Sequence, residues 1–342
     1  MTAHLTAPQA TLLTHRPILA MIGGLLALGL GLSGCSTGTT QAEPTTVSAP
    51  EAFPVEIDEP GAEGTVVIEE EPARIAVLSP DAAIALHELG ATDRVIAIPE
   101  AATSATLNPY SEQMAGVEHV VGGHTSPEPE QVLAWDPDLV VITARHTGEQ
   151  DASERLSAAG VPVLTLTNGW SSSEAVAENV EILGRATGMN DAAEELADEI
   201  IGGVADVRER AEGVGEMPTV AILSNQAQAP FINAGSSLVV EIVANGGGAS
   251  AAEELGIDNT MPVQPEQLVA MDPDYIMLVD VTGKGEDSFD SLLDHPALAA
   301  LSAVQDDRVA LFPGREMYGL AGREVVSASE AVLGWLHPDL AE

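Results

Sequence analysis

One segment of this sequence occurs twice with small changes. Residues 129–141 read Pro-Glu-Gln-Val-Leu-Ala-Trp-Asp-Pro-Asp-Leu-Val-Val, and residues 265–277 read Pro-Glu-Gln-Leu-Val-Ala-Met-Asp-Pro-Asp-Tyr-Ile-Met. Each copy predicts a short helix that begins at Pro, ends at Asp-Pro and is followed by a buried strand. Two copies so far apart in one chain favour two lobes built on the same plan. Two lobes predict a cleft, and a Glu at the same place in each lobe suggests a partner that contacts both.

The amino-acid composition limits the classes of protein to which this chain can belong. With 342 residues and 45% hydrophobic content, the chain can form two domains of ordinary size. Its formal net charge is −41, from 53 Asp and Glu against 12 Lys and Arg. We therefore expect no nucleic-acid partner, because phosphate binding requires clustered cations. Such acidity is typical of a solvated surface that resists aggregation.

The first segment has the features of an export signal. Residues 17–32 are apolar and rich in Gly, a length that is short for a membrane span but suits a signal-peptide core. Cys35 follows after Ser33 and Gly34 and is the only cysteine, which excludes internal disulfides and cysteine-based metal clusters. The Leu-Ser-Gly-Cys ending resembles a bacterial lipoprotein signal, which implies a signal peptide at 1–34 and lipidation of Cys35. An ordinary signal peptide or an anchor helix with an incidental cysteine is the alternative.

The segment after this cysteine predicts a flexible tether. Residues 35–65 are rich in Thr, Ser, Pro, Ala and Glu and show no apolar periodicity. We therefore expect the folded part of the protein outside the cytoplasmic membrane, held to the lipid bilayer through Cys35.

Beyond the tether, strand and helix patterns alternate. Strands are predicted at 74–78, 94–98, 139–143, 161–166, 219–223 and 308–312. Helices are predicted at 80–89, 152–159, 172–186, 191–211, 237–245 and 325–336. Such alternation favours parallel βαβ units. The predicted fold class is therefore α/β, with two βα lobes whose sheets are mostly parallel.

The architecture, the paired E-x-x-x-A-x-x-P-D segments and the closing segment 298–309 resemble a known family. This family comprises the substrate-binding lipoproteins of ABC importers that serve ferric siderophores, haem and vitamin B12, and the resemblance covers residues 66 to about 338. It implies that one long rigid helix joins the lobes and that ligand binds in the cleft between them. The expected parts are an N-terminal lobe at 66–188, a connecting helix at 189–213 and a C-terminal lobe at 214–342.

Glu130 and Glu266 hold the same place in the two repeat copies. Each follows a Pro that suits the first turn of a helix, where the helix dipole stabilises an acidic side chain. A solvated first-turn Glu would need no further role. The family resemblance implies one, because a Glu at this position in each lobe pairs with Arg residues on the permease dimer. We therefore expect both residues to dock the protein on an ABC permease.

Four cations fall in loops after predicted strands, whereas the other eight lie in the signal, before strands or on helices among acids. The four are Arg145, Lys284, Arg315 and Arg323. Ligands of open α/β sheets gather at the carboxyl ends of the strands. In so acidic a protein, this placement suggests an anionic ligand, although each residue could also be a lone surface charge.

Further polar and aromatic residues share these loops and complete the predicted ligand site. They are His124, His146, Trp170, Asn225, Gln226 and Tyr318. An aromatic ring in a cleft supplies a flat apolar surface with a polar group at its edge. We read Trp135, Tyr275 and Trp335 as packing residues, because they fall at helical or strand core positions.

The nature of the cargo is the least constrained prediction. A ferric siderophore needs cations and aromatic walls, which Arg145, Arg315, Arg323, Trp170 and Tyr318 could supply. Haem would need axial ligands, for which His124 and Tyr318 are the candidates, but the strand end that carries a Tyr in haem-binding relatives reads Ser224-Asn225 here. Cobalamin would need more aromatic surface than an aromatic content of 3% provides. No His-rich loop is present to bind a bare divalent ion. We expect a ferric siderophore, with haem or cobalamin as alternatives.

The sequence carries no recognisable catalytic motif. It lacks a complete P-loop, an H-E-x-x-H and a G-x-S-x-G. We therefore expect a monomeric solute-binding protein with no intrinsic cofactor and no enzymatic activity. An extracellular hydrolase with dispersed active-site residues and a structural surface lipoprotein are the remote alternatives.

Overall fold

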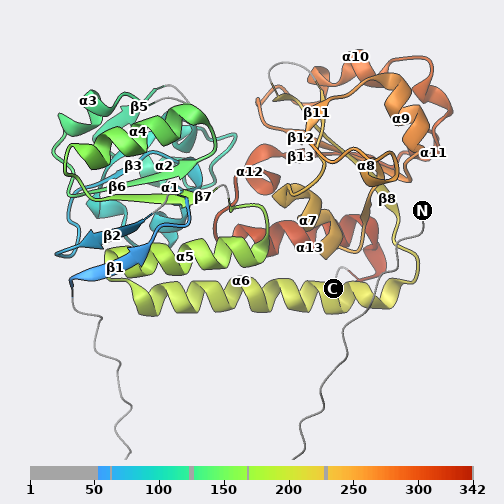
Figure 1. Cartoon of the computed structure of the whole chain (residues 1–342). Helices are drawn as coiled ribbons and strands as arrows, with labels where there is room; N and C mark the ends of the chain where they lie inside the picture. The colour runs from blue at the N-terminus through green and yellow to red at the C-terminus, as the bar shows by residue number, and fades with distance from the viewer. Residues whose placement is uncertain (1–52, 62–63, 123–126, 168, 227–229, 341–342) are drawn as a thin grey trace, which may run out of the picture. The chain divides into compact units, whose positions relative to one another are not determined.

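The structure is a computed structural model, and its described residues belong to one compact unit, Ser48–Glu342. It describes residues 53–61, 64–122, 127–167, 169–226 and 230–340 (Figure 1). The predicted signal peptide, Cys35 and His124 lie outside these residues. Within the described part of the chain, no helix is both long and apolar enough to cross a membrane.

The first sheet has five strands, all parallel, in the order β5-β4-β3-β6-β7. Its strands are β3 (Ile75–Val77), β4 (Val95–Pro99), β5 (His119–Val121), β6 (Leu139–Ala144) and β7 (Val163–Thr167). The helices among them are α1 (Pro80–Glu88), α2 (Ser111–Met114), α3 (Pro129–Leu133) and α4 (Thr147–Ala158). The central strands are buried on both faces, as expected of parallel strands that helices cover. This is the first of the two predicted lobes.

The second sheet has six strands and is parallel at its centre. The order is β11-β9-β8-β12-β13, with β10 also paired to β8; β8, β12, β13 and β10 run parallel, and β9 and β11 are antiparallel. Its strands are β8 (Thr219–Ser224), β9 (Phe231–Ile232), β10 (Ala249–Ser250), β11 (Met261–Pro262), β12 (Tyr275–Asp280) and β13 (Val309–Pro313). The accompanying helices are α7 (Leu238–Asn245), α8 (Ala251–Glu254), α9 (Pro265–Met271), α10 (Asp290–Leu293), α11 (Ser302–Gln305), α12 (Gly314–Met317) and α13 (Glu324–Leu336). The mostly parallel α/β fold is confirmed.

The repeated segment has the same local structure in both sheets. Asp272 caps the end of α9, and Asp136 lies three residues beyond the end of α3; both have left-handed backbones, at φ of 42° and 53°. Two residues later, the carboxylate of Asp138 accepts hydrogen bonds from the backbone N–H groups of residues 73 and 74, both at 2.8 Å. Asp274 likewise accepts from the backbone N–H of Thr219 at 2.9 Å. The second Asp of each copy therefore ties its strand to the start of the neighbouring strand.

Two consecutive helices connect the first sheet to the second. α5 (Ser173–Thr187) ends at Gly188, whose φ of 72° favours glycine, and α6 (Asn190–Ala211) follows at once. α6 packs against α5, α7 and α13 (Figure 1). Its buried face carries Leu196, Ile200 and Val204 at helical spacing. The long helix is confirmed over Asn190–Ala211, whereas the exact lobe boundaries stay predictions.

One structural element lies where the sequence favoured a tether. β1 (Val55–Asp58) and β2 (Thr65–Ile68) form an antiparallel hairpin, so ordered structure begins within the segment 35–65. The pattern Val-Glu-Ile-Asp alternates apolar and acidic residues, and its apolar side chains are buried. Four residues of alternation among many polar ones were too short a signal to be recognised.

Candidate ligand-binding pocket

A cavity of about 540 Å³ lies at the carboxyl ends of strands from both sheets. On the side of the first sheet, the start of α1 and the loops after β6 and β7 supply Asp81, Arg145 and Trp170. On the side of the second sheet, the loop before α7 supplies Ser236 and Ser237, and the segment after α12 supplies Tyr318. A cavity of this size and position is typical of small-molecule sites in open α/β proteins.

Asp81 and Arg145 form an ion pair in the wall of this pocket. The Asp81 side chain is only 6% exposed and that of Arg145 is 23% exposed. The backbone N–H of Arg145 also donates to Glu149 Oε2 at 2.7 Å. Burial acts to lower the pKa of Arg145, but the charge and hydrogen bond of Asp81 and the charge of Glu149 outweigh it and raise the pKa. The guanidinium is therefore charged at all physiological pH values, and its charge is compensated within the protein.

Tyr318 supplies a hydroxyl group to the pocket. Gln226 Nε2 donates a hydrogen bond to the Tyr318 hydroxyl at 3.2 Å and another to Ser224 Oγ at 3.0 Å. Burial raises the pKa of Tyr318, although the charge of Arg145 acts to lower it. The phenol is therefore protonated near neutral pH. With Gln226 donating to its oxygen, the Tyr318 hydroxyl can donate its own proton to a ligand.

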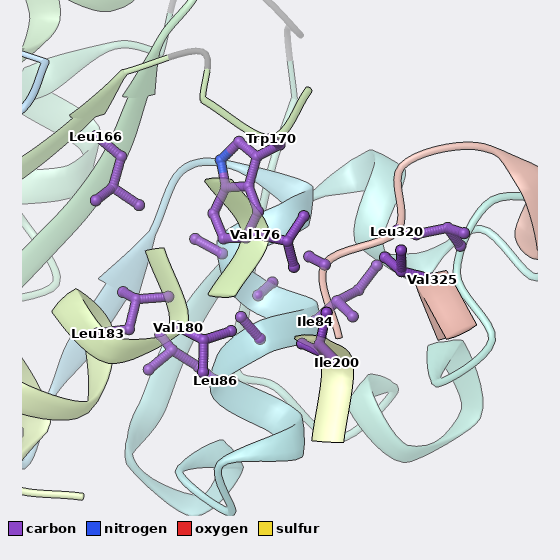
Figure 2. Packing of buried hydrophobic residues seen from close by; sticks show 14 of the residues in the cluster. Ile84, Leu86, Leu166, Trp170, Val176, Val180, Leu183, Ile200, Leu320 and Val325 are labelled. Atoms are coloured by element: carbon purple, nitrogen blue, oxygen red, sulfur yellow. The ribbon is translucent and has the colours of Figure 1, made fainter. Parts of the chain in front are cut away.

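Trp170 forms an apolar part of the pocket wall. Its side chain is 5% exposed and packs in the buried cluster beside Val176 (Figure 2). The indole Nε1–H donates to Thr143 Oγ1 at 3.3 Å. Because both the ring plane and the polar edge are held, Trp170 presents a fixed flat surface to any ligand.

The charges of the residues that line the pocket nearly cancel. Within the described ranges of the chain, they are two carboxylates, Asp81 and Asp258, and one guanidinium, that of Arg145. The other polar lining residues are neutral hydrogen-bonding groups: Asn108, Ser171, Ser236, Ser237, Asn259, Thr260 and Tyr318. The pocket thus suits a ligand with many polar atoms and without net negative charge.

Asn225 and Lys284 lie at a different hollow, of about 480 Å³, at the end of β12. Asn225 is buried, and its Nδ2 donates to Asp280 Oδ1 at 2.6 Å and to Ser288 Oγ at 2.8 Å. The Asp280 carboxylate in turn accepts from the backbone N–H groups of residues 282–285. These bonds give Asn225 a part in shaping the loop that carries Lys284.

The remaining predicted ligand residues do not line the pocket. Arg315 is half exposed and lies 3.7 Å from Glu316. Arg323 pairs with Glu88 at 3.2 Å and with Glu199 at 3.0 Å. His146 caps the start of α4, with its Nδ1 3.3 Å from Glu149 Oε2. Of the predicted set, the structure brings Arg145, Trp170 and Tyr318 together in the pocket, with Gln226 behind Tyr318.

Sequence reasoning missed the acidic and hydroxyl residues of the pocket. Asp81 follows a predicted strand in Ser79-Pro80-Asp81, but acids are so frequent in this chain that one more carried little signal. Ser236 and Ser237 follow β9, a strand of only two residues that no pattern indicated. The rule that sites lie at strand ends could have found Asp81, had it been applied to acids as well as to cations.

Glu130 and Glu266 are exposed in the first turns of α3 and α9, as the repeat predicts. Glu130 pairs with Arg155 of α4 at 2.5 Å. Both helices begin with Pro and lie next to the buried strands β6 and β12. The two side chains therefore occupy equivalent sites on the two sheets.

Known proteins resemble this chain over most of its length. The family model described as periplasmic binding protein matches residues 75–316. An uncharacterized ABC transporter substrate-binding lipoprotein of Bacillus subtilis is 27% identical over 260 residues, which span 75% of this chain and 79% of the relative. A cobalamin-binding protein of Halobacterium salinarum is 29% identical over 275 residues, which span 77% of this chain and 67% of the relative.

Solved structures share the fold. The periplasmic heme-binding protein RhuT of Roseiflexus sp. RS-1, in apo form, has a TM-score of 0.66 at 24% identity, covering 79% of this chain and 99% of that protein. CeuE of Helicobacter pylori with bound Ni(II) has a TM-score of 0.68 at 18% identity, covering 84% of this chain and 90% of that protein. The matched family model, which spans both sheets and the helix α6, shows that this chain belongs to the periplasmic binding protein family.

Proposed function

We propose that this protein is the solute-binding component of an ABC importer and that its ligand is a corrinoid such as cobalamin. The observation that carries the choice of ligand is the charge balance of the pocket. Among the described residues that line it, Arg145 is the one cation, and it is paired with Asp81. An anionic ligand would meet Asp81 and Asp258 without a cation left to neutralise it.

The other lining groups suit the chemistry of a corrinoid. A corrin ring has flat apolar faces and is edged by amide side chains, which both donate and accept hydrogen bonds. Trp170 offers a fixed apolar surface, and the Tyr318 hydroxyl can donate to an amide carbonyl. Ser236, Ser237 and Asn259 offer further neutral donors and acceptors. The relative from Halobacterium salinarum, which is named a cobalamin-binding protein, adds support.

A ferric siderophore, the ligand that we expected from the sequence, is the second candidate. Trp170, Tyr318 and Arg145 would serve such a complex, and all three line the pocket. The expectation also rested on Arg315 and Arg323, neither of which lines the pocket. Haem is less suited, because burial keeps the Tyr318 phenol protonated and so weakens it as an axial ligand.

Direct titration distinguishes these ligands. The mature chain with Cys35→Ser is titrated by calorimetry with cyanocobalamin, with a ferric hydroxamate complex and with haemin. We expect a Kd of about 1 μM or tighter for cyanocobalamin and at least 100-fold weaker binding of the other two. Tight binding of the ferric complex without binding of cyanocobalamin would overturn the choice of a corrinoid.

Tryptophan fluorescence locates the bound ligand within the protein. Quenching by cyanocobalamin is compared between Trp170→Phe and the matched variant Trp135→Phe, whose ring stacks on His119 away from the pocket. The Trp170→Phe variant is expected to lose most of the quenching and the Trp135→Phe variant to keep it. The reverse pattern would place the ligand elsewhere.

For the permease partner, we propose that Glu130 and Glu266 dock the two lobes on a permease dimer. Both are exposed in equivalent first turns, which supports contact with a two-fold partner. Reversal of both charges, Glu130→Lys with Glu266→Lys, should abolish uptake in cells and leave ligand affinity unchanged. Unchanged uptake would exclude the docking role.

For the membrane anchor, we propose that Cys35 is lipidated and that the mature protein begins there. The relative from Bacillus subtilis is named a lipoprotein, and the Leu-Ser-Gly-Cys ending follows an apolar core in this chain. Cys35→Ser should release the protein from the membrane fraction, and mass spectrometry of the wild-type N-terminal peptide should show a diacylglyceryl group. An unmodified cysteine in that peptide would exclude the anchor.

A further inference from the structure

A cluster of ionisable side chains lies where α1 meets the start of α13. Glu88 ends α1, Tyr110 precedes α2, and Arg323 and Glu324 begin α13. Glu199 approaches from α6. None of these residues lines the pocket or has a part in the function proposed above.

Glu88 is the centre of this cluster. Its side chain is 1% exposed, although it is a carboxylate in a protein whose acids are mostly solvated. The Tyr110 hydroxyl donates to Glu88 Oε1 at 2.6 Å, and Arg323 Nη1 lies 3.2 Å from Glu88 Oε2. The backbone N–H of Arg323 donates to the same Oε2 at 3.2 Å. Glu88, on the first lobe, is therefore bound by the segment that begins the last helix of the second lobe.

Glu324 brings a second carboxyl group into the same space. Its carboxyl group lies within interaction range of Glu88 and of Tyr110, and its buried Oε2 has no hydrogen-bond partner in the described part of the chain. Two buried carboxylates this close repel each other strongly unless one of them holds a proton.

The cluster shares its elements with the pocket. Ile84, one turn before Glu88 on α1, and Leu320, just before Arg323, both line the pocket. Figure 2 shows Ile84, Leu320 and Val325 near one another with Ile200 of α6, and all four belong to one buried cluster. A change in the contact between α1 and α13 would therefore move parts of both pocket walls.

We propose that a proton held between Glu88 and Glu324 fastens α1 to α13 beneath the pocket, and that loss of this proton at higher pH loosens the two lobes. This pH response requires no ligand, because Glu88 and Glu324 lie in the contact between the lobes and not in the pocket. It would make the separation of the lobes, and with it the capture or release of cargo, depend on the pH outside the cell membrane.

The direction of the pH dependence follows from the proton balance. Burial, followed by the charge and hydrogen bond of Glu88, raises the pKa of Glu324 from 4.5 to about 7. If the lobes separate, Glu324 meets water and its pKa returns toward 4.5. The contact is therefore strongest at low pH and weakens by up to about tenfold per pH unit between about 4.5 and 7.

The neighbouring groups do not reverse this direction. The pKa values of Tyr110 and Arg323 are both raised, so each keeps its proton throughout the range. Glu199 is exposed and accepts hydrogen bonds from Arg323 Nε at 3.3 Å and Nη2 at 3.0 Å. His87 contacts Tyr110 with ring centroids 4.5 Å apart, and burial lowers its pKa. Both residues belong to the first lobe, so separation of the lobes leaves this contact in place.

Electron paramagnetic resonance of the ligand-free protein tests this inference. Spin labels are attached at Val120→Cys and Val269→Cys, two exposed positions on the first and second lobes, in a chain that carries Cys35→Ser. The distance distribution is expected to shift and broaden between pH 5 and pH 8. In the Glu324→Gln background, which keeps a neutral side chain at all pH values, the low-pH distribution should persist at pH 8.

The matched control is Glu330→Gln, which removes an exposed carboxylate from the same helix that pairs only with Arg210. This control should keep the full pH response. If Glu324→Gln does not fold, Glu88→Gln removes the same repulsion from the α1 side and should give the same persistence. A wild-type distribution that does not change with pH, or an equal change in Glu324→Gln, would overturn the inference. Neither result depends on the identity of the ligand.

Discussion

Asp81 and Arg145 form an ion pair that joins the start of α1 to the loop after β6 in the wall of the pocket. The Asp81 side chain is 6% exposed, so its carboxylate depends on Arg145 for charge compensation. The pair fixes the charge that any ligand meets in this pocket.

Removal of Arg145 alone should destabilise the protein. In Arg145→Met, the buried carboxylate of Asp81 loses its ion-pair partner, and we expect the free energy of unfolding to fall by about 3 kcal/mol. The double variant Asp81→Asn with Arg145→Met should recover more than half of this loss, because the Asp81 site then holds no buried charge without its partner. Urea unfolding followed by circular dichroism measures the stability of both variants.

The control Arg315→Met removes an exposed cation and should change stability by less than about 0.5 kcal/mol. An equal loss in Arg145→Met and Arg315→Met would refute the role of the pair.

Removal of the Tyr318 hydroxyl should weaken ligand binding and should lower stability by only about 1 kcal/mol, through the lost hydrogen bond from Gln226. Tyr318→Phe removes one hydrogen bond to the ligand, so the Kd for cyanocobalamin should rise about 5- to 10-fold in calorimetry. Tyr275→Phe is the matched control, because that ring packs against Trp335 away from the pocket. Equal affinities of the two variants would show that the Tyr318 hydroxyl does not contact the ligand.

The two aspartates that tie neighbouring strands should contribute to stability in equivalent ways. Asp138→Ala leaves two backbone N–H groups without their acceptor, and Asp274→Ala leaves that of Thr219 without one. Each change should lower the free energy of unfolding by about 2 kcal/mol, and Asn at either position should cost less because it keeps one acceptor oxygen. Thermal unfolding by calorimetry is the measurement. Unchanged stability in both Ala variants would contradict this account of the repeat.

The buried Glu324 should add a pH dependence of stability that is opposite to that of a salt-bridged carboxylate. Its pKa is raised to about 7, so the folded protein binds this proton more tightly than the unfolded chain. Its stabilising contribution is therefore complete below pH 4.5 and is lost as pH rises to about 7, at up to about 1.4 kcal/mol per pH unit. The difference in unfolding free energy between wild type and Glu324→Gln, measured from pH 4.5 to pH 8, isolates this contribution from the other acids. A difference that does not change over this range would rule out the raised pKa.

Much of the fold was predictable because strand and helix periods were long and clear. The strand 139–143 and the helix 191–211 were predicted within a residue of β6 and α6. The loops after strands correctly indicated Arg145, Trp170 and Tyr318 as neighbours, since carboxyl ends of parallel strands share one edge. Arg323 follows the same rule in sequence, yet its guanidinium turns toward Glu88 and Glu199. The direction of a side chain depends on packing partners that lie far away in the sequence, and a local sequence pattern holds no information about those partners.

The sequence by itself determined the two-lobe plan, because hydrophobic periodicity and the repeated Pro-Glu-Gln segments are local properties of the chain. Only the tertiary structure decided that Asp81 neutralises Arg145 in the pocket and that Glu88 and Glu324 share one buried space. The first contact joins residues 64 positions apart and the second joins the two lobes. Charge compensation and proton sharing depend on distances of a few ångströms, and folding alone sets those distances.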